Sequence, residues 1–477
     1  KDANSSYRVQ TKEELLFKEV KSPVAFAYAQ NTVNDFKRQP LMINPLSFFG
    51  PCLVKGDVNG DGLEDVFAGG ASGQAGALYI QQKGGQFIMQ PQPAFEADKM
   101  SEDADAVFFD ANGDGFVDLY VASGGYHSFA PDDTRLQDRL YLNDGKGKFK
   151  KSEDALPPMH ASKSCVRIAD INGDGYPDVF VGGRVIPGRY PETPQSYILI
   201  NDGKGQFSDQ TKNIAPALQY AGMITDAAWL DMNDDKKSDL IITGEWMPVM
   251  VFVNNNGKLE DKTTTYFEKP CYGWWNKLLV QDMNGDGRLD LIAGNMGLNT
   301  QCKVSEAEPA EMYFKDFDDN GSVDPILCFY IQNKSYPYVT RDELLDQMST
   351  MRTRYANYKS FADQTLADIF TNDDLKGAGH LKADCLNTTY FEMGSEGKFH
   401  AKSLPLPAQA SPVFTINALD YNKDGKQDLL LCGNINQARL RFGKYDANYG
   451  VLLKGDGKGN FEYVPQWQSG FRLWGDV

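Results

Sequence analysis

Long apolar runs and recognisable catalytic signatures are both missing from this sequence. No apolar run approaches the roughly 20 residues of a membrane-spanning helix, so we expect no integral membrane contact. Histidine is scarce, with four in 477 residues, and none of the four has the spacing of a metal ligand: His127, His160, His380 and His400. The chain also lacks a GxSxG motif, a phosphate-binding P-loop and a dinucleotide fingerprint. These absences favour a binding protein over an enzyme.

Cysteine is present in an odd number, seven. Four cysteines lie inside apolar strand patterns, where small buried side chains are expected rather than half-cystines: Cys52, Cys165, Cys328 and Cys432. Cys271, Cys302 and Cys385 lie in connecting segments. The sequence leaves open whether any two of these three form a disulfide.

What the sequence has in abundance is one acidic nonapeptide, written seven times with a carboxylate or carboxamide at positions 1, 3, 5 and 9 and usually glycine at position 6. Loops 1 to 7 read DVNGDGLED from Asp57, DANGDGFVD from Asp110, DINGDGYPD from Asp170, DMNDDKKSD from Asp231, DMNGDGRLD from Asp282, DFDDNGSVD from Asp316 and DYNKDGKQD from Asp420. A single copy could be an Asx-rich β-turn, because Asp, Asn and Gly fill turns for local reasons. Chance does not explain seven copies.

The spacing of these oxygens is typical of a calcium loop. Calcium takes six to eight oxygen ligands at about 2.3–2.6 Å, and a tightly curled loop can supply alternate side chains and the carbonyl of position 7. Glycine at position 6 permits the left-handed turn. The aspartate at position 9 closes the loop and apolar residues follow it directly, which indicates strand, loop, strand rather than the two helices of an EF-hand.

The predicted calcium ligands are the same five positions of six loops. They are Asp57, Asn59, Asp61, Leu63 and Asp65; Asp110, Asn112, Asp114, Phe116 and Asp118; Asp170, Asn172, Asp174, Tyr176 and Asp178; Asp282, Asn284, Asp286, Arg288 and Asp290; Asp316, Asp318, Asn320, Ser322 and Asp324; and Asp420, Asn422, Asp424, Lys426 and Asp428. Loop 4 has Lys236 in place of glycine, followed by Lys237. We expect loop 4 to bind weakly or not at all, and the chain to bind about five to seven calcium ions.

Calcium also accounts for the acidity of the chain. The formal charge is −17, from 48 basic and 65 acidic residues, and 21 aspartates stand at positions 1, 3, 5 and 9 of the loops. Seven divalent ions would offset 14 of these 17 negative charges. The acidic balance argues against a nucleic-acid partner. Because millimolar calcium is found outside the cytosol, we expect an extracytoplasmic protein that is secreted, periplasmic or at the cell surface.

A larger unit recurs around each loop. A short apolar strand, the loop, a second strand ending in glycines, a gap, a third strand, a polar glycine turn and a fourth strand repeat at about 50 to 60 residues. This pattern predicts an all-β protein, a seven-bladed β-propeller of four-stranded antiparallel blades, as a single domain over residues 1–477. The segment ELLFKEV near residue 17 resembles a fourth strand that closes the ring by pairing into the last blade.

The period is broken in one place. Loops 5 and 6 begin 34 residues apart and loops 6 and 7 begin 104 apart. The excess lies in residues 335–385, where Thr340 and Glu343 form a capping box and apolar residues have helical spacing. We predict a helical hairpin inserted in the sixth blade, which the strands NTTYFEMG and GKFHA then complete.

These residues and motifs resemble the FG-GAP or VCBS repeat proteins, whose propellers include the integrin α-subunit head and the cartilage acidic protein group. DxNxDGxxD followed by a strand ending in GG carries the resemblance from about Ser47 to Val464. The segments GNMGLN at 294, VTRDELL at 339, SPVF at 411 and YDANYG at 445 resemble the exported bacterial branch. The resemblance implies a secreted or envelope calcium propeller used in binding and adhesion.

A ligand is expected on the face opposite the calcium loops, where the long connections lie. A mouth rimmed by arginine, tryptophan and asparagine could bind a glycan or a protein partner by stacking and bidentate contacts. The candidate residues are Arg184, Arg189, Trp246, Trp274, Trp275, Asn295, Arg439 and Arg441. The tryptophans could equally pack between blades.

Two other functions remain open. The first is a polysaccharide lyase of the calcium-loop propeller type, because some rhamnogalacturonan lyases are propellers rich in similar loops. In such an enzyme calcium would acidify a uronate, and Lys or Arg would act as the base. The second is an integrin-like adhesin, in which calcium bridges a carboxylate of the partner.

Overall fold

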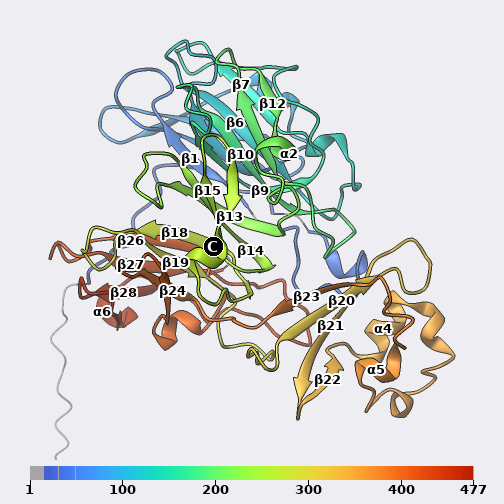
Figure 1. The fold of residues 1–477 in the computed structure, drawn as a ribbon. Helices are drawn as coiled ribbons and strands as arrows, with labels where there is room; N and C mark the ends of the chain where they lie inside the picture. Colours follow the sequence, from blue (N-terminus) through green and yellow to red (C-terminus); the bar gives the residue numbers. More distant parts are fainter. Residues whose placement is uncertain (1–14, 31, 49, 476–477) are drawn as a thin grey trace, which may run out of the picture.

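The computed structural model describes residues 15–30, 32–48 and 50–475, and they form seven sheets of four antiparallel strands each (Figure 1). Sheet 1 contains β1 (Leu53–Gly56), β2 (Asp65–Ala68), β3 (Ala77–Gln81) and β4 (Phe87–Gln90); sheet 2 contains β5 (Glu102–Phe109), β6 (Asp118–Gly124), β7 (Arg139–Asn143) and β8 (Phe149–Lys151). Sheet 3 contains β9 (Ser162–Ala169), β10 (Asp178–Val185), β11 (Tyr197–Asn201) and β12 (Phe207–Asp209); sheet 4 contains β13 (Met223–Leu230), β14 (Asp239–Met247), β15 (Met250–Asn254) and β16 (Leu259–Asp261), with β17 (Gly273–Trp274) paired to β14. Sheet 5 contains β18 (Lys277–Gln281), β19 (Asp290–Gly294), β24 (Thr389–Met393) and β25 (Phe399–Ser403); sheet 6 contains β20 (Ala310–Lys315), β21 (Asp324–Ile331), β22 (Lys334–Pro337) and β23 (Gly379–Ala383); sheet 7 contains β26 (Thr415–Leu419), β27 (Asp428–Cys432), β28 (Val451–Gly455) and β29 (Phe461–Val464). The prediction of an all-β fold with seven four-stranded units is confirmed, and the arrangement is consistent with a seven-bladed propeller.

Helices are few and short. They are α1 (Pro93–Ala97), α2 (Thr211–Ile214), α3 (Thr263–Tyr266), α4 (Arg341–Gln347), α5 (Leu366–Ile369) and α6 (Gln466–Ser469), with the 3-10 turns η1 (Asp35–Lys37), η2 (Thr134–Leu136), η3 (Ser349–Arg352), η4 (Tyr358–Ser360) and η5 (Leu406–Gln409). Within the described residues, none of the helices has the length and apolarity needed to cross a bilayer.

Each acidic loop joins two strands in the same register. In sheet 1, Gly56 stands just before the loop and pairs with Asp65 at position 9, and in sheet 2 Phe109 pairs with Asp118 in the same way. The other five sheets repeat this pairing. The closing aspartate therefore belongs both to the loop and to the second strand.

The sheets follow one another along the chain, with one interruption. The first strands of successive sheets are in contact, from β1 to β5, β9, β13, β18 and β26. Sheet 6 is inserted into sheet 5, because β24 pairs with β19 after β20–β23 have formed a sheet of their own. NTTYFEMG and GKFHA form β24 and β25, so these strands complete sheet 5 and not the sixth blade as predicted. The strand order of sheet 6 is β22-β21-β20-β23, so β22 and β23 are its two edge strands.

The inserted sheet carries the helical segment of residues 335–385. Figure 1 shows α4 and α5 beside β20–β22, away from the other sheets. The predicted capping box is confirmed: Thr340 and Glu343 exchange hydrogen bonds at the start of α4. Apolar residues of both helices, among them Leu344 and Ile369, pack against β21 in one buried cluster. Both ends of the segment are strand, since β22 precedes the helices and β23 follows them.

The N-terminal segment reaches the last sheet without forming a strand there. Of ELLFKEV, residues 15–20 are described and have no strand structure, and Glu14 lies outside the described residues. The backbone N–H of Phe17 donates to the carbonyl of Ser469 at 2.8 Å, and the Phe17 ring lies edge-on to Phe471 at 5.6 Å. The described part of the segment thus contacts the chain just beyond β29 through this hydrogen bond and ring contact, and the predicted strand is corrected to an extended contact.

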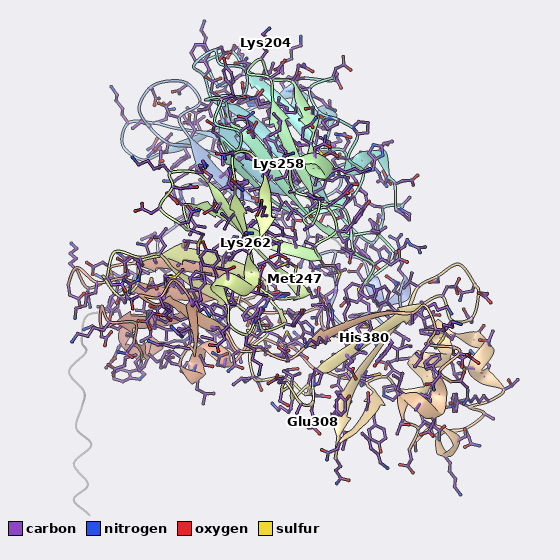
Figure 2. All side chains as sticks on the ribbon, viewed as in Figure 1. Lys204, Met247, Lys258, Lys262, Glu308 and His380 are labelled. Atoms are coloured by element: carbon purple, nitrogen blue, oxygen red, sulfur yellow. The ribbon has the colours of Figure 1, made fainter. Side chains whose placement is uncertain are left out.

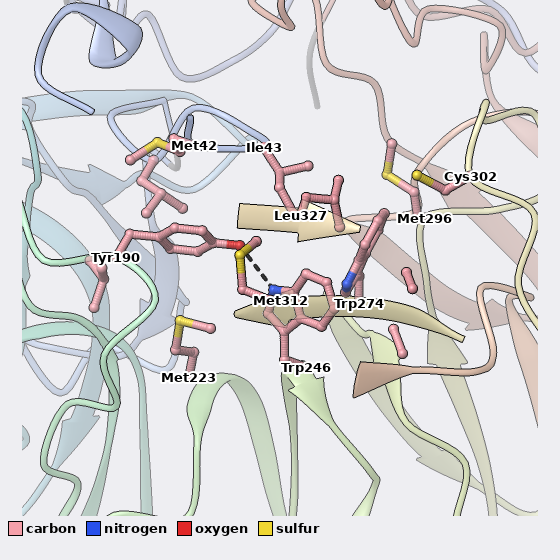
Figure 3. Close-up of a cluster of buried hydrophobic side chains, with 14 of the residues drawn as sticks. Met42, Ile43, Tyr190, Met223, Trp246, Trp274, Met296, Cys302, Met312 and Leu327 are labelled. Atoms are coloured by element: carbon pink, nitrogen blue, oxygen red, sulfur yellow. Dashed lines mark hydrogen bonds between the residues drawn. The ribbon is translucent and has the colours of Figure 1, made fainter. Parts of the chain in front are cut away.

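A large hydrophobic cluster, here called the central cluster, joins the inserted sheet to the other sheets (Figure 3). Trp246 at the end of β14 and Trp274 in β17 pack edge to face, with ring centroids 5.1 Å apart. Met312 of β20 and Leu327 of β21 belong to the same cluster. The Trp246 indole N–H donates to the Tyr190 hydroxyl at 2.9 Å. Because β14 starts at loop 4 and ends at Trp246, the inserted sheet docks at the end of β14 remote from that loop.

We expect the central cluster to contribute strongly to stability. Trp246→Ala removes a side chain that is 3% exposed, and large-to-small changes of buried tryptophan cost about 3–5 kcal/mol. Trp467→Ala is the matched control, because Trp467 is 61% exposed and its loss should change stability by less than about 0.5 kcal/mol. Urea unfolding followed by circular dichroism measures both, and equal midpoints for the two variants would contradict the packing described.

Candidate metal centres

The backbone of each acidic loop curls around the carboxylate at position 1. In loop 2, Asp110 Oδ1 accepts from the Gly113 N–H at 2.7 Å and Asp110 Oδ2 from the Gly115 N–H at 2.8 Å. Asp114 at position 5 accepts from the Phe116 N–H at 2.9 Å. Gly115 has a φ of +87°, which glycine adopts without the strain that a Cβ would cause. The curl brings the polar side chains of positions 1, 3 and 5 together, and Asn112 at position 3 donates to Asp114 at position 5 at 2.9 Å.

The aspartate at position 9 is the most buried acidic group of the loop. Asp118 Oδ2 accepts from the Ala111 N–H at 3.0 Å, and Oδ1 accepts from the Asn143 N–H at 2.8 Å. Burial, together with the nearby charges of Asp114 and Asp110, outweighs these two hydrogen bonds and raises the pKa of Asp118 to about 6. The pKa values of Asp178 and Asp324 are raised to about 6 in the same way.

Burial is the largest cause of these raised pKa values, and like-charge repulsion from the neighbouring carboxylates of the loop adds to it. A divalent cation would remove this repulsion, and carboxylate and carbonyl oxygens are the donors that calcium prefers. Because ligand carboxylates must be deprotonated, protons compete with a cation at these positions below about pH 6. The donor set therefore fits a hard divalent metal.

Loop 6 shows the clearest convergence of oxygens. Carboxylate oxygens of Asp316, Asp318 and Asp324 lie within 4.8 Å of one another. Two oxygens bound to one calcium at about 2.5 Å lie at most about 5 Å apart, so the group has the right size. Asp318 Oδ1 is buried and has no hydrogen-bond partner among the described residues. This acidic cluster could hold a metal ion.

Loop 4 differs from the others as its sequence indicates. Lys236 has a φ of +68°, a left-handed conformation that strains a residue with a Cβ. The Lys237 ammonium lies 3.3 Å from an oxygen of Asp235 at position 5. Arg288 pairs with the position 5 carboxylate of loop 5 in the same way, so the conformation of Lys236 is what sets loop 4 apart, and weak metal binding by loop 4 stays a prediction.

An asparagine at the end of the third strand connects neighbouring loops. In sheet 2, Asn143 donates its side-chain N–H to the Val58 carbonyl of loop 1 at 2.8 Å and to the position 8 carbonyl of its own loop at 2.9 Å. Its backbone N–H holds Asp118, as described above. Asn201 and Asn254 make the same three hydrogen bonds in sheets 3 and 4. Sequence reasoning missed these residues, although each starts or precedes the polar glycine turn of its repeat.

The glycine turn that follows the asparagine packs on the neighbouring loop. A Cβ on Gly147 would lie 3.2 Å from the Val58 side chain of loop 1, and one on Gly205 would lie 3.3 Å from Asn112 of loop 2. Adjacent loops are therefore linked by hydrogen bonds and by close packing. A metal bound in one loop would therefore order a segment that contacts the asparagine and the glycine turn of the next sheet.

Most of the predicted ligand-binding residues are buried on the far side of the sheets. Six are 8% exposed or less: Arg184, Trp246, Trp274, Trp275, Asn295 and Arg439. Asn295 Oδ1 accepts from the Trp274 N–H at 3.1 Å, and Arg439 pairs with Glu343 of α4 at 2.7 Å. Five of these side chains pack or pair inside the protein, and Arg184, which pairs with Glu245, also lines a cavity of about 100 Å³. The hydrophobic driving force that buries the tryptophans also closes the mouth that they were predicted to line.

The other two predicted arginines are partly exposed. The side chain of Arg189 is 40% exposed and pairs with Glu192. The side chain of Arg441 is 28% exposed, donates to the Tyr338 carbonyl at 2.6 Å and stacks on the Tyr338 ring. Both are held by local partners, so the structure does not bring the eight residues together as one site.

The inserted sheet has a cleft that the sequence analysis did not identify. Its volume is about 690 Å³, and it lies between the sheet and α5. Glu311 in its wall accepts hydrogen bonds from Tyr313 at 3.2 Å and from the neighbouring His380 at 3.0 Å, and His380 stacks on Tyr313 at 4.5 Å. Figure 2 shows His380 on this sheet, away from Lys204 and Lys258 in sheets 3 and 4. Burial alone would raise the pKa of Glu311, but the hydrogen bonds from His380, Tyr313 and Tyr330 outweigh burial. The pKa is therefore lowered, and the carboxyl group is ionised at neutral pH.

Comparison with protein families identifies the repeats. The family of the FG-GAP-like repeat matches residues 57–121, 110–181 and 231–293. The chain contains FG-GAP-like repeats. The matched FG-GAP-like segments begin at the first residue of loops 1, 2 and 4. Comparison with curated proteins found no match.

Comparison with solved structures found matches of low sequence identity. The biofilm matrix protein Bap1 of V. cholerae is 11% identical to this chain, with a TM-score of 0.33, and the match covers 90% of this chain and 80% of that one. A rhamnogalacturonan lyase of Bacillus licheniformis is 11% identical, with a TM-score of 0.34, and the match covers 89% of this chain and 72% of that one.

The hydrogen bonds between FG-GAP-like repeats can be tested at Asn201. Asn201→Ala leaves the buried carbonyl of Ala111 and the partly buried carbonyl of Pro177 without this donor, which costs about 1–3 kcal/mol. Asn372→Ala is the control, because Asn372 is exposed and should change stability by less than about 0.5 kcal/mol. Thermal and urea unfolding measure both variants. If Asn201→Ala and the control have the same unfolding midpoints, the hydrogen bonds between the loops do not stabilise the fold.

Proposed function

We propose that this protein is a calcium-stabilised β-propeller that acts outside the cytoplasm as a non-catalytic binding module for a glycan or protein partner. Calcium fits the loops better than magnesium, because five oxygen donors from one curled loop suit its larger and more flexible coordination shell. All seven loops have the oxygen donors, and loop 4 is the exception in having Lys236 where the other six loops have glycine. The millimolar calcium concentrations that fill such sites are found outside the cytosol.

The cleft on the inserted sheet supports the binding role. Its volume of about 690 Å³ lies within the range of ligand pockets, about 300–1,000 Å³. The cleft lies on sheet 6, which among the described residues is the one sheet inserted into another. This sheet packs on the end of β14 that is remote from loop 4. A partner bound there would leave the calcium loops free to stabilise the fold.

The chemistry of the cleft favours a carbohydrate. Its lining combines aromatic rings with charged groups: Tyr313, Tyr330, Phe370, Glu311, Lys334 and Asp368. Sugar rings stack on aromatic faces, and their hydroxyl groups donate to carboxylates. The ionised Glu311 already accepts hydrogen bonds from two tyrosines and a histidine, so the polar wall is preorganised.

Removing calcium tests the structural part of the proposal. Chelation by EDTA should lower the melting temperature by ten degrees or more, because several ions that bind only the folded loops are lost together. Differential scanning fluorimetry measures the shift, and added calcium should restore the melting temperature where equal magnesium does not. An unchanged melt in the chelator would contradict calcium as a structural ion.

A glycan array on the purified protein identifies the ligand, and tyrosine variants test the cleft. Tyr330→Ala removes a ring of the cleft, and we expect at least a tenfold loss of affinity by isothermal titration calorimetry. Tyr220→Ala is the matched control, because Tyr220 is a 60% exposed tyrosine between sheets 3 and 4 and should leave the affinity unchanged. Equal affinities of the two variants would place the ligand elsewhere.

The lyase alternative makes a different prediction with the same protein. A polysaccharide lyase would release an unsaturated product from pectic polymers, seen as a rise in ultraviolet absorbance. The binding module should produce none at any calcium concentration. Binding without turnover supports the proposal, and steady product formation overturns it.

A further inference from the structure

Two of the seven cysteines lie against each other, and the other five do not share their surroundings. Cys52, Cys165, Cys328 and Cys432 are buried in or beside strands of four different sheets, as predicted, and Cys302 is buried in the central cluster. Cys271 and Cys385 are partly buried and lie in connecting segments. Cys271 comes just before β17, and Cys385 follows β23, where the chain returns from the inserted sheet to β24.

Backbone hydrogen bonds hold these two segments side by side. The N–H groups of Asp384 and Cys385 both donate to the Tyr272 carbonyl, at 2.9 Å and 3.0 Å. The Tyr272 N–H donates back to Asp384 Oδ1 at 2.8 Å. The backbone of Cys385 is therefore hydrogen-bonded to Tyr272, the residue that follows Cys271. Both cysteine side chains pack on the same hydrophobic cluster, which contains Trp275, so they point to one side.

The two thiols interact directly, and the interaction polarises them. The hydrogen bond between the thiols lowers the pKa of Cys385 and raises the pKa of Cys271. Cys271 therefore acts as the donor and Cys385 as the acceptor. Because the thiolate is the attacking species in disulfide exchange, Cys385 is suited to react first.

We propose that Cys271 and Cys385 form a disulfide that fastens the exit of the inserted sheet to the segment between sheets 4 and 5. The oxidant is an external disulfide, such as oxidised glutathione. The Cys385 thiolate attacks one sulfur of the oxidant, whose S–S bond breaks and releases one thiolate. The deprotonated Cys271 sulfur then attacks the mixed disulfide at Cys385 and releases the second thiolate. Two electrons pass to the oxidant, and the two cysteine protons end on the released thiols or in water.

The link would close a loop that contains β18, β19 and the whole inserted sheet. Closing so long a loop removes much of the conformational freedom of the unfolded chain, which stabilises the folded state. It would also hold the point at which β23 leaves the inserted sheet. This inference does not depend on the ligand of the cleft.

Mass spectrometry of the full-length chain tests the pairing. The protein is equilibrated in buffers of oxidised and reduced glutathione, denatured, treated with N-ethylmaleimide and digested without reduction. We expect a linked peptide pair containing Cys271 and Cys385 in the oxidised sample, with the other five cysteines alkylated. Alkylation of both residues at every glutathione ratio, or a link that includes Cys302, overturns the assignment.

Melting temperatures test the consequence of the link. The oxidised native chain should melt a few degrees above the reduced chain. Cys385→Ser should lose this difference, and Cys302→Ala should keep it. A native chain that is linked but melts as the reduced form does would show that the disulfide does not fasten the inserted sheet.

Discussion

The hydrogen bonds to the buried carboxylate at the ninth position of each acidic loop are the interactions on which the architecture of the sheets depends. In sheet 2, one oxygen of Asp118 holds the start of its loop and the other holds Asn143 at the end of the third strand. The first three strands therefore meet at a single side chain. Such a carboxylate is costly to bury, as its raised pKa shows, and the two backbone N–H groups that donate to it offset part of this cost.

The asparagines extend this local arrangement from one sheet to the next. Asn143, Asn201 and Asn254 each hold a closing aspartate with the backbone and a neighbouring loop with the side chain. Charged pairs do similar work nearer the first strands, where Arg167 contacts Asp105 of sheet 2 and Asp226 of sheet 4. Polar contacts between sheets thus accompany the apolar packing that usually joins blades, and both depend on strands that the loops align.

The sequence was informative wherever structure depends on neighbours along the chain. The loops, their flanking strands and the capping box of α4 follow from local patterns, and they were predicted correctly. Strand pairing over long distances does not leave such a pattern, so β24 was placed in the sixth blade instead of beside β19. The tryptophans were placed at an open mouth for the same reason: an indole looks alike in sequence whether it stacks on a sugar or on Trp274. Glu311 and His380 are 69 residues apart, and only the pairing of β20 with β23 brings them together.

The insertion of sheet 6 between two paired strands of sheet 5 affects how the length of this chain can vary. The chain departs after β19 and comes back at β24, and these two strands are direct neighbours with Ala293 opposite Thr389. A short hairpin turn could span that gap, as it does between the second and third strands of a simple antiparallel sheet. The excursion leaves and rejoins sheet 5 at one point, so its length and content can vary without changing the pairing of β19 with β24, provided that the apolar surface around Trp246 and Trp274 stays covered.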